Sequence, residues 1–163
     1  MALGPILDVP IMSGVFALQF KYGKRIASFL IKSKIPRIVL AVLVSVPLLS
    51  FEENINCGAF ECKHTLWPPT LWFLIIEGFL FLLIIRKTRL KTTFKQTLAY
   101  AIYGMLFEFT IGEPGPGLRS LLAGNPLVFV LIMLWVGISY AFVIYLPLLI
   151  LNQTENADQP RQV

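Results

Sequence analysis

The feature that most constrains the fold is the segment 127–151, which contains no charged residue. The hydrocarbon core of a bilayer is about 30 Å thick and needs roughly 20 apolar residues in a helix, because every backbone amide must find its hydrogen-bond partner inside the segment. The segment 127–151 exceeds that length, and such an uninterrupted run is untypical of a soluble core. It is therefore predicted to span a membrane, with enough length to tilt.

Three shorter apolar blocks precede this segment, at 38–51, 66–85 and 97–112. The whole chain is 56% hydrophobic and only 14% charged, whereas soluble domains carry roughly 25% charged residues. Each block approaches the length of a membrane helix. The sequence therefore predicts an all-α integral membrane protein, a four-transmembrane-helix bundle preceded by an amphipathic interfacial helix.

The basic residues predict an orientation for this bundle. Eleven of the fourteen lysines and arginines lie before the first block or between the second and third. They are Lys21, Lys24, Arg25, Lys32, Lys34, Arg37, Arg86, Lys87, Arg89, Lys91 and Lys95. In a four-span arrangement both groups lie on one side, which the positive-inside rule assigns to the cytoplasm. We therefore expect a multi-pass protein of the plasma membrane with both termini in the cytoplasm, and the net charge of +5 requires no nucleic-acid partner.

The chain is expected to divide into an N-terminal cytoplasmic or interfacial segment 1–37, a bundle 38–151 and a polar tail 152–163. Between Phe20 and Lys32, a helical register separates basic residues from apolar ones. This pattern predicts a helix lying on the inner leaflet, with its cations towards anionic headgroups; the alternative is a basic linker without a stable helix. The preceding residues 11–20 are too few to span and are expected to be re-entrant or interfacial.

The loop between the first two blocks contains both cysteines, Cys57 and Cys62. The predicted topology places this loop outside the cell, where disulfides form, so a Cys57–Cys62 disulfide is expected. His64 adds a third potential metal ligand, but zinc sites usually have a fourth ligand and a tighter cysteine spacing. We therefore expect no metal, and an inverted orientation would leave two free thiols.

Two acidic residues lie inside the apolar blocks, Glu77 and Glu108. A carboxylate costs about 2.5–3.5 kcal/mol at the centre of a membrane helix on insertion scales, and burial favours its protonated form. If their helices are neighbours, the two carboxyls can share a proton or a cation, or each can bond a tyrosine hydroxyl. The functional interpretation is a proton or ion relay, or a polar substrate pocket. The alternative is that each carboxyl joins neighbouring helices by a hydrogen bond, or that Glu108 reaches the membrane surface.

The loop after the third block is rich in glycine and proline and carries Arg119. Arg119 is a candidate partner for Glu108, for Glu113, or for a lipid phosphate or substrate carboxylate; the alternative is a solvated loop residue. Small residues form seams in the last two blocks, Ala101 with Gly104 and Gly137 with Ala141, and these predict helix–helix contacts.

No hydrolase or metal-enzyme motif is present, so catalytic residues stay unknown and no cofactor is expected. The predicted function is a small membrane subunit of a transport or membrane complex, handling a small polar species or a proton near Glu77 and Glu108. The expected partners are the lipid bilayer and further copies of the chain or other membrane subunits. Two alternatives are a membrane-embedded enzyme acting on a lipid or isoprenoid, and a structural assembly factor.

Overall fold

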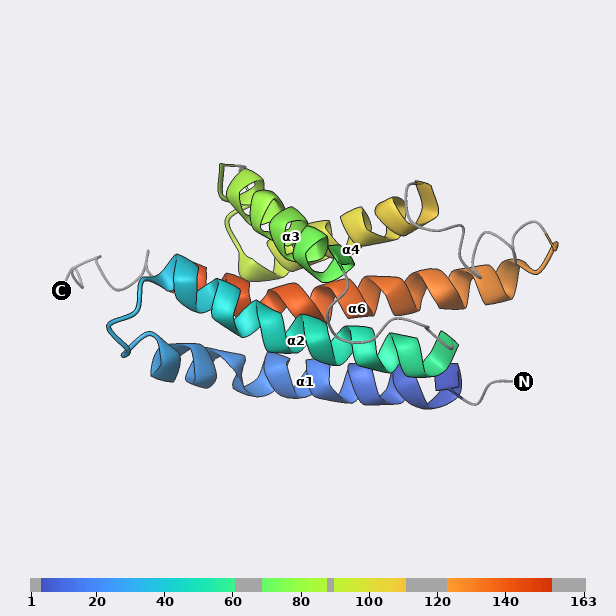
Figure 1. Cartoon of the computed structure of the whole chain (residues 1–163), viewed down its shortest axis with the longest axis horizontal. Coiled ribbons are helices and arrows are strands. Elements are labelled where there is room, and N and C mark those ends of the chain that lie inside the picture. The colour runs from blue at the N-terminus through green and yellow to red at the C-terminus, as the bar shows by residue number, and fades with distance from the viewer. Residues whose placement is uncertain (1–3, 61–68, 88–89, 111–122, 154–163) are drawn as a thin grey trace.

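The computed structural model describes residues 4–60, 69–87, 90–110 and 123–153 of the chain. The ordered elements in these ranges are five α-helices (Figure 1). They are α1 (Gly4–Leu30), α2 (Arg37–Phe60), α3 (Pro69–Lys87), α4 (Thr93–Thr110) and α6 (Pro126–Asn152). The all-helical part of the predicted fold class is therefore confirmed for the described residues.

Local side-chain chemistry sets where two of these helices begin. Asn125 caps α6, because its side-chain oxygen accepts a hydrogen bond from the Val128 backbone N–H at 3.2 Å, and Pro126 occupies the first turn. Both residues suit the start of a helix. The Asn125 side chain satisfies a backbone N–H that has no partner inside the helix, and proline has no backbone N–H that would require one. In the same way, the Thr92 hydroxyl accepts a hydrogen bond from the Lys95 backbone N–H at 3.3 Å, just before α4.

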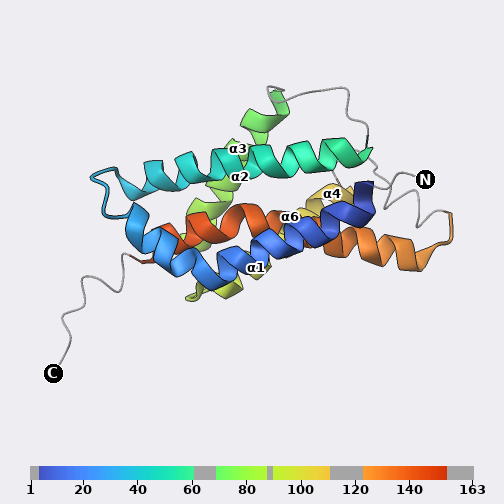
Figure 2. The ribbon, with the colours of Figure 1, turned by 90° about the horizontal axis from the view of Figure 1, so that it is seen from below.

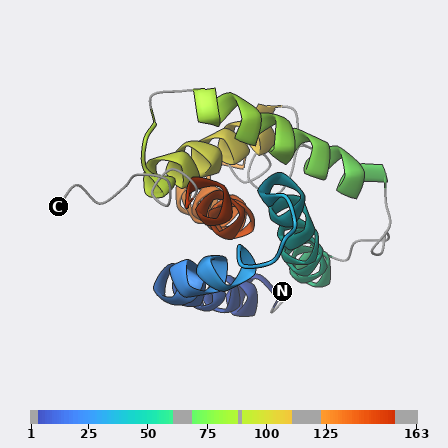
Figure 3. The ribbon, with the colours of Figure 1, turned by 90° about the vertical axis from the view of Figure 1, so that its left-hand side faces the viewer.

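α6 is the central helix, and α1, α2 and α4 all pack against it. α1 runs beside α6 in the same direction, whereas α2 runs the opposite way (Figure 2). The parallel course of α1 is fixed by an edge-to-face contact between the Phe16 and Tyr145 rings and by a hydrogen bond from the Ser28 hydroxyl to the Gln153 side chain. Seen along the bundle, α3 lies over α2 and α4, on the side away from α1 (Figure 3).

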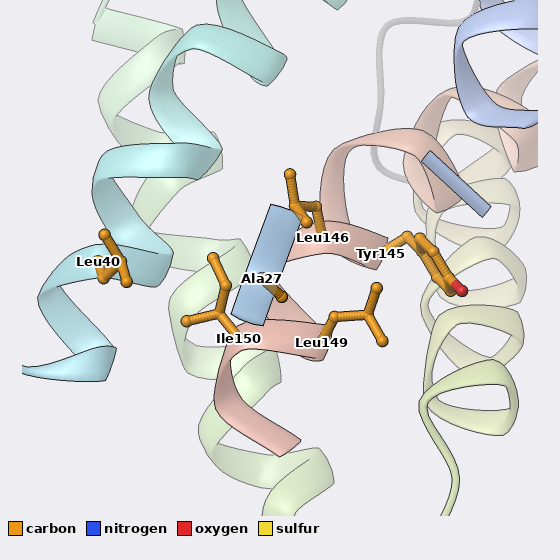
Figure 4. Packing of buried hydrophobic residues seen from close by; sticks show 6 residues of the cluster. All are labelled: Ala27, Leu40, Tyr145, Leu146, Leu149 and Ile150. Carbon is orange, nitrogen blue, oxygen red and sulfur yellow. The ribbon is translucent and has the colours of Figure 1, made fainter. Parts of the chain in front are cut away.

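The second half of α6 is the centre of the core. Residues 141–151 are all buried, whereas Leu127, Leu131 and Leu134 near the start of the helix are exposed. Figure 4 shows one of the three core clusters, in which Ala27 of α1 and Leu40 of α2 meet the inner face of α6. The residues that α6 contributes to it are Tyr145, Leu146, Leu149 and Ile150.

The prediction of four membrane spans is wrong. Among the described residues, one helix, α6, is long and apolar enough to cross a membrane, by length and composition. The third predicted span shows the physical reason for the error, because it belongs to a helix that begins earlier and has a polar first turn. In that turn Gln96 and Thr97 are buried and form hydrogen bonds within the protein, so the helix is not an apolar cylinder over its length.

The N-terminal part of the chain also differs from the prediction. The expected interfacial helix and the short segment before it form one continuous helix, α1, which includes Pro10. Met12 and Ala27 are fully buried at its two halves, because the inner stripe of α1 packs on α2 and α6. The separate interfacial helix is therefore replaced by a helix of the bundle.

The two described chain ends lie at opposite ends of the bundle. Since α1 and α6 run in parallel, the start of α1 is far from the end of α6 (Figure 1). The prediction that both termini share the cytoplasmic side is not supported by this arrangement.

Candidate functional site

The Glu108 carboxyl and the Tyr140 hydroxyl form the one predicted acidic site whose side chains the structure describes. Tyr140 Oη donates a hydrogen bond to Glu108 Oε1 at 3.0 Å, which joins α4 to α6. Glu108 is half-buried. Burial raises the pKa of the Glu108 carboxyl above its ordinary value, and the hydrogen bond from Tyr140 acts in the opposite direction. A hydrogen bond to a tyrosine hydroxyl is one of the alternatives that the sequence leaves open for Glu108, and the structure contains such a bond.

Gly104 allows the Tyr140 ring to approach α4. A Cβ atom built on Gly104 would overlap the Tyr140 ring atoms Cδ1, Cγ and Cδ2. Ala101 is buried one turn earlier, and Gly137 of α6 lies against the Met105 side chain. Gly104 and Gly137 therefore lie in the contact between α4 and α6, which places the Tyr140 hydroxyl at Glu108.

An aromatic cluster of four rings, Phe81, Tyr100, Tyr103 and Tyr140, adjoins this pair. The Tyr100 ring lies 5.4 Å from the Tyr140 ring and 4.7 Å from the Phe81 ring, between ring centroids. The Tyr103 ring lies 5.0 Å from the Phe81 ring. Three helices, α3, α4 and α6, thus contribute rings to one cluster beside the Glu108 carboxyl.

The backbone of α3 comes close to this cluster directly after Glu77. A Cβ atom built on Gly78 would lie 3.1 Å from the Tyr100 hydroxyl oxygen. Glu77 itself belongs to α3, and its side chain lies outside the described part of the structure. The structure therefore brings the helix of Glu77 to the cluster that contains Tyr140, while the expected sharing of a proton between the two carboxyls stays a prediction.

The other predicted site residues are outside the described side chains. Arg119, Cys62 and His64 lie in segments that the structure does not describe, and Cys57 belongs to the last part of α2, where only the backbone is described. The Cys57–Cys62 disulfide and the role of Arg119 stay predictions. Within the described residues, no group of three histidine, cysteine or acidic side chains is placed to hold a metal ion.

Sequence reasoning misses a polar network at the end of α6. The Asn152 side-chain nitrogen donates to Gln96 Oε1 at 2.6 Å and to Thr93 Oγ1 at 3.0 Å. The Gln96 nitrogen in turn donates to the Leu90 carbonyl at 2.9 Å. Asn152 is therefore part of the bundle and not of the predicted polar tail. Its position directly after a long apolar run is the one feature of the sequence that indicates a hydrogen-bonding role at the end of the helix.

Two further buried polar residues, Gln19 and Glu52, are also missed. Gln19 is only 6% exposed, and neither of its amide atoms has a hydrogen-bond partner among the described residues. The burial of Gln19 could have been predicted from its position, because it lies on the same face of α1 as the buried residues Met12, Gly23 and Ala27. Glu52 is buried in α2, because this helix continues past the end of the first apolar block.

Replacing Glu108 with glutamine is expected to remove a decrease in the free energy of unfolding that the wild type shows as pH rises above the unfolded pKa of Glu108. The folded state holds the Glu108 proton more tightly than the unfolded chain does. The resulting stabilisation is therefore present below the unfolded pKa of 4.5 and is lost as pH rises through the raised folded pKa. Thermal unfolding in mild detergent, followed from pH 4 to pH 8, tests this. Tyr140→Phe removes the hydrogen bond that lowers the pKa of Glu108, so the same loss of stability should occur at higher pH. Identical stability profiles for the wild type and both variants would contradict a raised pKa of Glu108.

Comparison with known proteins gives no relative for this chain. No family model matches it, and no curated protein or solved structure does so either.

Proposed function

We propose that the protein is a membrane-associated helical subunit that handles a proton or a small polar species at the Glu108–Tyr140 pair. Glu77, on the neighbouring helix α3, is the second acidic group of the proposed site. The proposed partners are lipid and further membrane subunits, which include copies of the same chain. The observation that carries the proposal is the Tyr140 hydroxyl bonded to a half-buried carboxyl, with the Tyr140 ring itself in an aromatic cluster.

The apolar surface of the described residues supports a membrane environment. Large exposed apolar side chains occur on all five helices. On α4 they form one outward face at helical spacing, made of Phe94, Leu98, Ile102, Leu106 and Phe109. Soluble monomers rarely expose contiguous apolar areas of this kind, and α6 is long and apolar enough to cross a membrane. Lipid or another membrane subunit is therefore the proposed surrounding of these faces.

The chemistry of the pair supports a protonation site. A carboxyl in a low-dielectric surrounding favours its neutral form, and a hydroxyl at hydrogen-bond distance orients whichever form is present. An acidic side chain is expensive next to lipid, so it usually faces other helices or a polar pathway. Glu108 meets this description, because its carboxyl faces α6 and is bonded there.

A purely structural role is the second candidate, and one observation favours it. The contact between α4 and α6 has hydrogen bonds in two places, from Tyr140 to Glu108 and from Asn152 to Gln96 and Thr93. Partly buried hydrogen bonds of this kind fix the register of two helices, so Glu108 would act as a link between them. The two roles differ in whether the carboxyl exchanges its proton with water.

Infrared spectroscopy of the purified protein separates these roles. We expect one component of the carboxylic-acid C=O stretching band to grow as pH falls, to shift within seconds of transfer into D₂O, and to be missing when the spectrum of Glu108→Gln is compared with that of the wild type. Tyr140→Phe should shift the frequency of this band because the hydroxyl no longer bonds the carboxyl. Glu52→Gln is the matched control and should keep the band. A Glu108 band that is insensitive to pH and to D₂O would reject the proposed proton site and leave the structural role.

A further inference from the structure

The end of α6 holds together two basic segments that are far apart in the sequence. Asn152 bonds Thr93 and Gln96 at the start of α4. Its neighbour Gln153 accepts a hydrogen bond from the Ser28 hydroxyl and donates one to the Lys24 carbonyl, both near the end of α1. The connection from α1 to α2 and the start of α4 therefore lie toward the same end of the bundle (Figure 1).

Five described cations lie in the connection from α1 to α2, at the start of α2 and around the start of α4, and we call this group the basic end: Lys32, Lys34, Arg37, Lys91 and Lys95. The four lysines are exposed, and Arg37 is partly buried. The segments 21–37 and 90–97 that supply them contain no acidic residue. Among the described residues none of the five forms an ion pair, and Arg37 Nη1 is buried there without a hydrogen-bond partner. The basic end is therefore a concentration of positive charge that is not paired with acidic side chains among the described residues.

Exposed apolar side chains lie among these cations in both segments. Phe29 is 74% exposed one turn before Lys32, and Ile35 and Ile38 are exposed on either side of Arg37. Phe94, beside Lys95, is 61% exposed. A surface for free phosphate or for a nucleic acid needs cations but gains little from apolar neighbours, whereas the boundary between headgroups and acyl chains favours both.

We propose that the basic end binds the headgroups of anionic phospholipids. The headgroup phosphates lie against the exposed lysines of the two segments, and the partly buried Arg37 guanidinium adds positive charge beside them. Phe29, Ile35, Ile38 and Phe94 contact the adjoining part of the lipid. This assignment does not depend on a proton site at Glu108, so the two proposals stand or fall separately.

The test measures binding of fluorescently labelled phosphatidylglycerol to the full chain in mild, uncharged detergent at low ionic strength. Three variants are compared: Lys32→Gln with Lys34→Gln, Lys91→Gln with Lys95→Gln, and all four together. Attraction to anionic lipid corresponds to roughly a fivefold change in affinity per cation, so each pair should weaken binding on the order of twentyfold. The fourfold variant should bind phosphatidylglycerol no better than phosphatidylcholine.

Controls at the same positions keep the result specific. The four lysines are exposed, so the variants should fold as the wild type does, which thermal unfolding checks. Lys→Arg at all four positions preserves the charge and should preserve binding, and Glu108→Gln should bind phosphatidylglycerol as the wild type does. Equal binding by all variants, or an effect from only one of the two segments, would overturn a shared headgroup surface. Displacement of the lipid by millimolar inorganic phosphate would overturn a lipid as the occupant.

Discussion

Gly104→Ala is expected to destabilise the protein by about 1–3 kcal/mol, the usual range for a group forced into a packed site. The added methyl group would occupy the space of the Tyr140 ring, and its nearest neighbours there are ring atoms close to Cβ. Such atoms cannot move away as the tip of a long flexible side chain can. Either α4 shifts away from α6 or the Tyr140 ring leaves its position, and both changes break the hydrogen bond to Glu108. Thermal and denaturant unfolding in detergent measure the loss.

A matched glycine in the same chain provides the control. Gly14 lies in α1, and a methyl group added there would have no atom within 4 Å beyond its own helical surroundings. Gly14→Ala should therefore be stabilising by roughly 0.5–1 kcal/mol, because alanine loses less conformational entropy than glycine in a helix. If Gly104→Ala behaves like Gly14→Ala, the close packing of Tyr140 on α4 is incorrect.

Phe142→Ala is expected to cost about 3–5 kcal/mol, as for other large aromatic side chains removed from a core. Phe142 is 0% exposed and packs with Met12 of α1 and Leu49 of α2, so its removal leaves a cavity at the meeting point of three helices. Its ring also lies 5.9 Å from the Phe51 ring, between centroids. The side chains around the cavity lose their dispersion contacts with the Phe142 ring, and this loss does not depend on whether water or lipid surrounds the bundle.

Leu134→Ala is the control on the same helix. The Leu134 side chain is 56% exposed, so its removal should change the free energy of unfolding by no more than about 0.5 kcal/mol. Equal losses for Phe142→Ala and Leu134→Ala would mean that α6 presents a different face to α1 and α2.

The sequence is most informative about α6. The predicted block 127–151 matches the helix Pro126–Asn152, because a long uncharged run leaves a backbone few alternatives to a helix. The number of membrane-spanning helices cannot be obtained from the apolar blocks of the sequence in the same way. Apolar residues on a helix indicate burial, but they do not tell whether another helix or lipid covers them. The continuity of α1 is also missed, because residues 11–20 are too few to span a membrane and the basic residues begin directly after them, whereas packing on α6 joins both parts in one helix.

For the candidate site, sequence reasoning identifies Glu108 but not its partner. The Tyr140 hydroxyl comes from a residue that is distant in the chain, and its position depends on how closely α4 and α6 approach each other. Gly104 carries the available signal, since a small residue in a membrane-type helix indicates a close contact. Which of the tyrosines fills that contact is decided by the rotation of α6, and this rotation follows from the packing of its other faces.

The central position of α6 has a consequence for the order in which the molecule assembles. α1 and α2 leave the ribosome first, yet Met12, Ala27 and Leu49 find their α6 neighbours only after residues 126–152 have been made. At ordinary elongation rates of about 5–20 residues per second, this interval lasts on the order of ten seconds. During that time the sides of α1 and α2 that face α6 in the folded protein lack the helix that covers them. A nascent chain stopped before residue 126 should therefore expose these faces to chaperones or to the insertion machinery, and its release should depend on synthesis of the last helix.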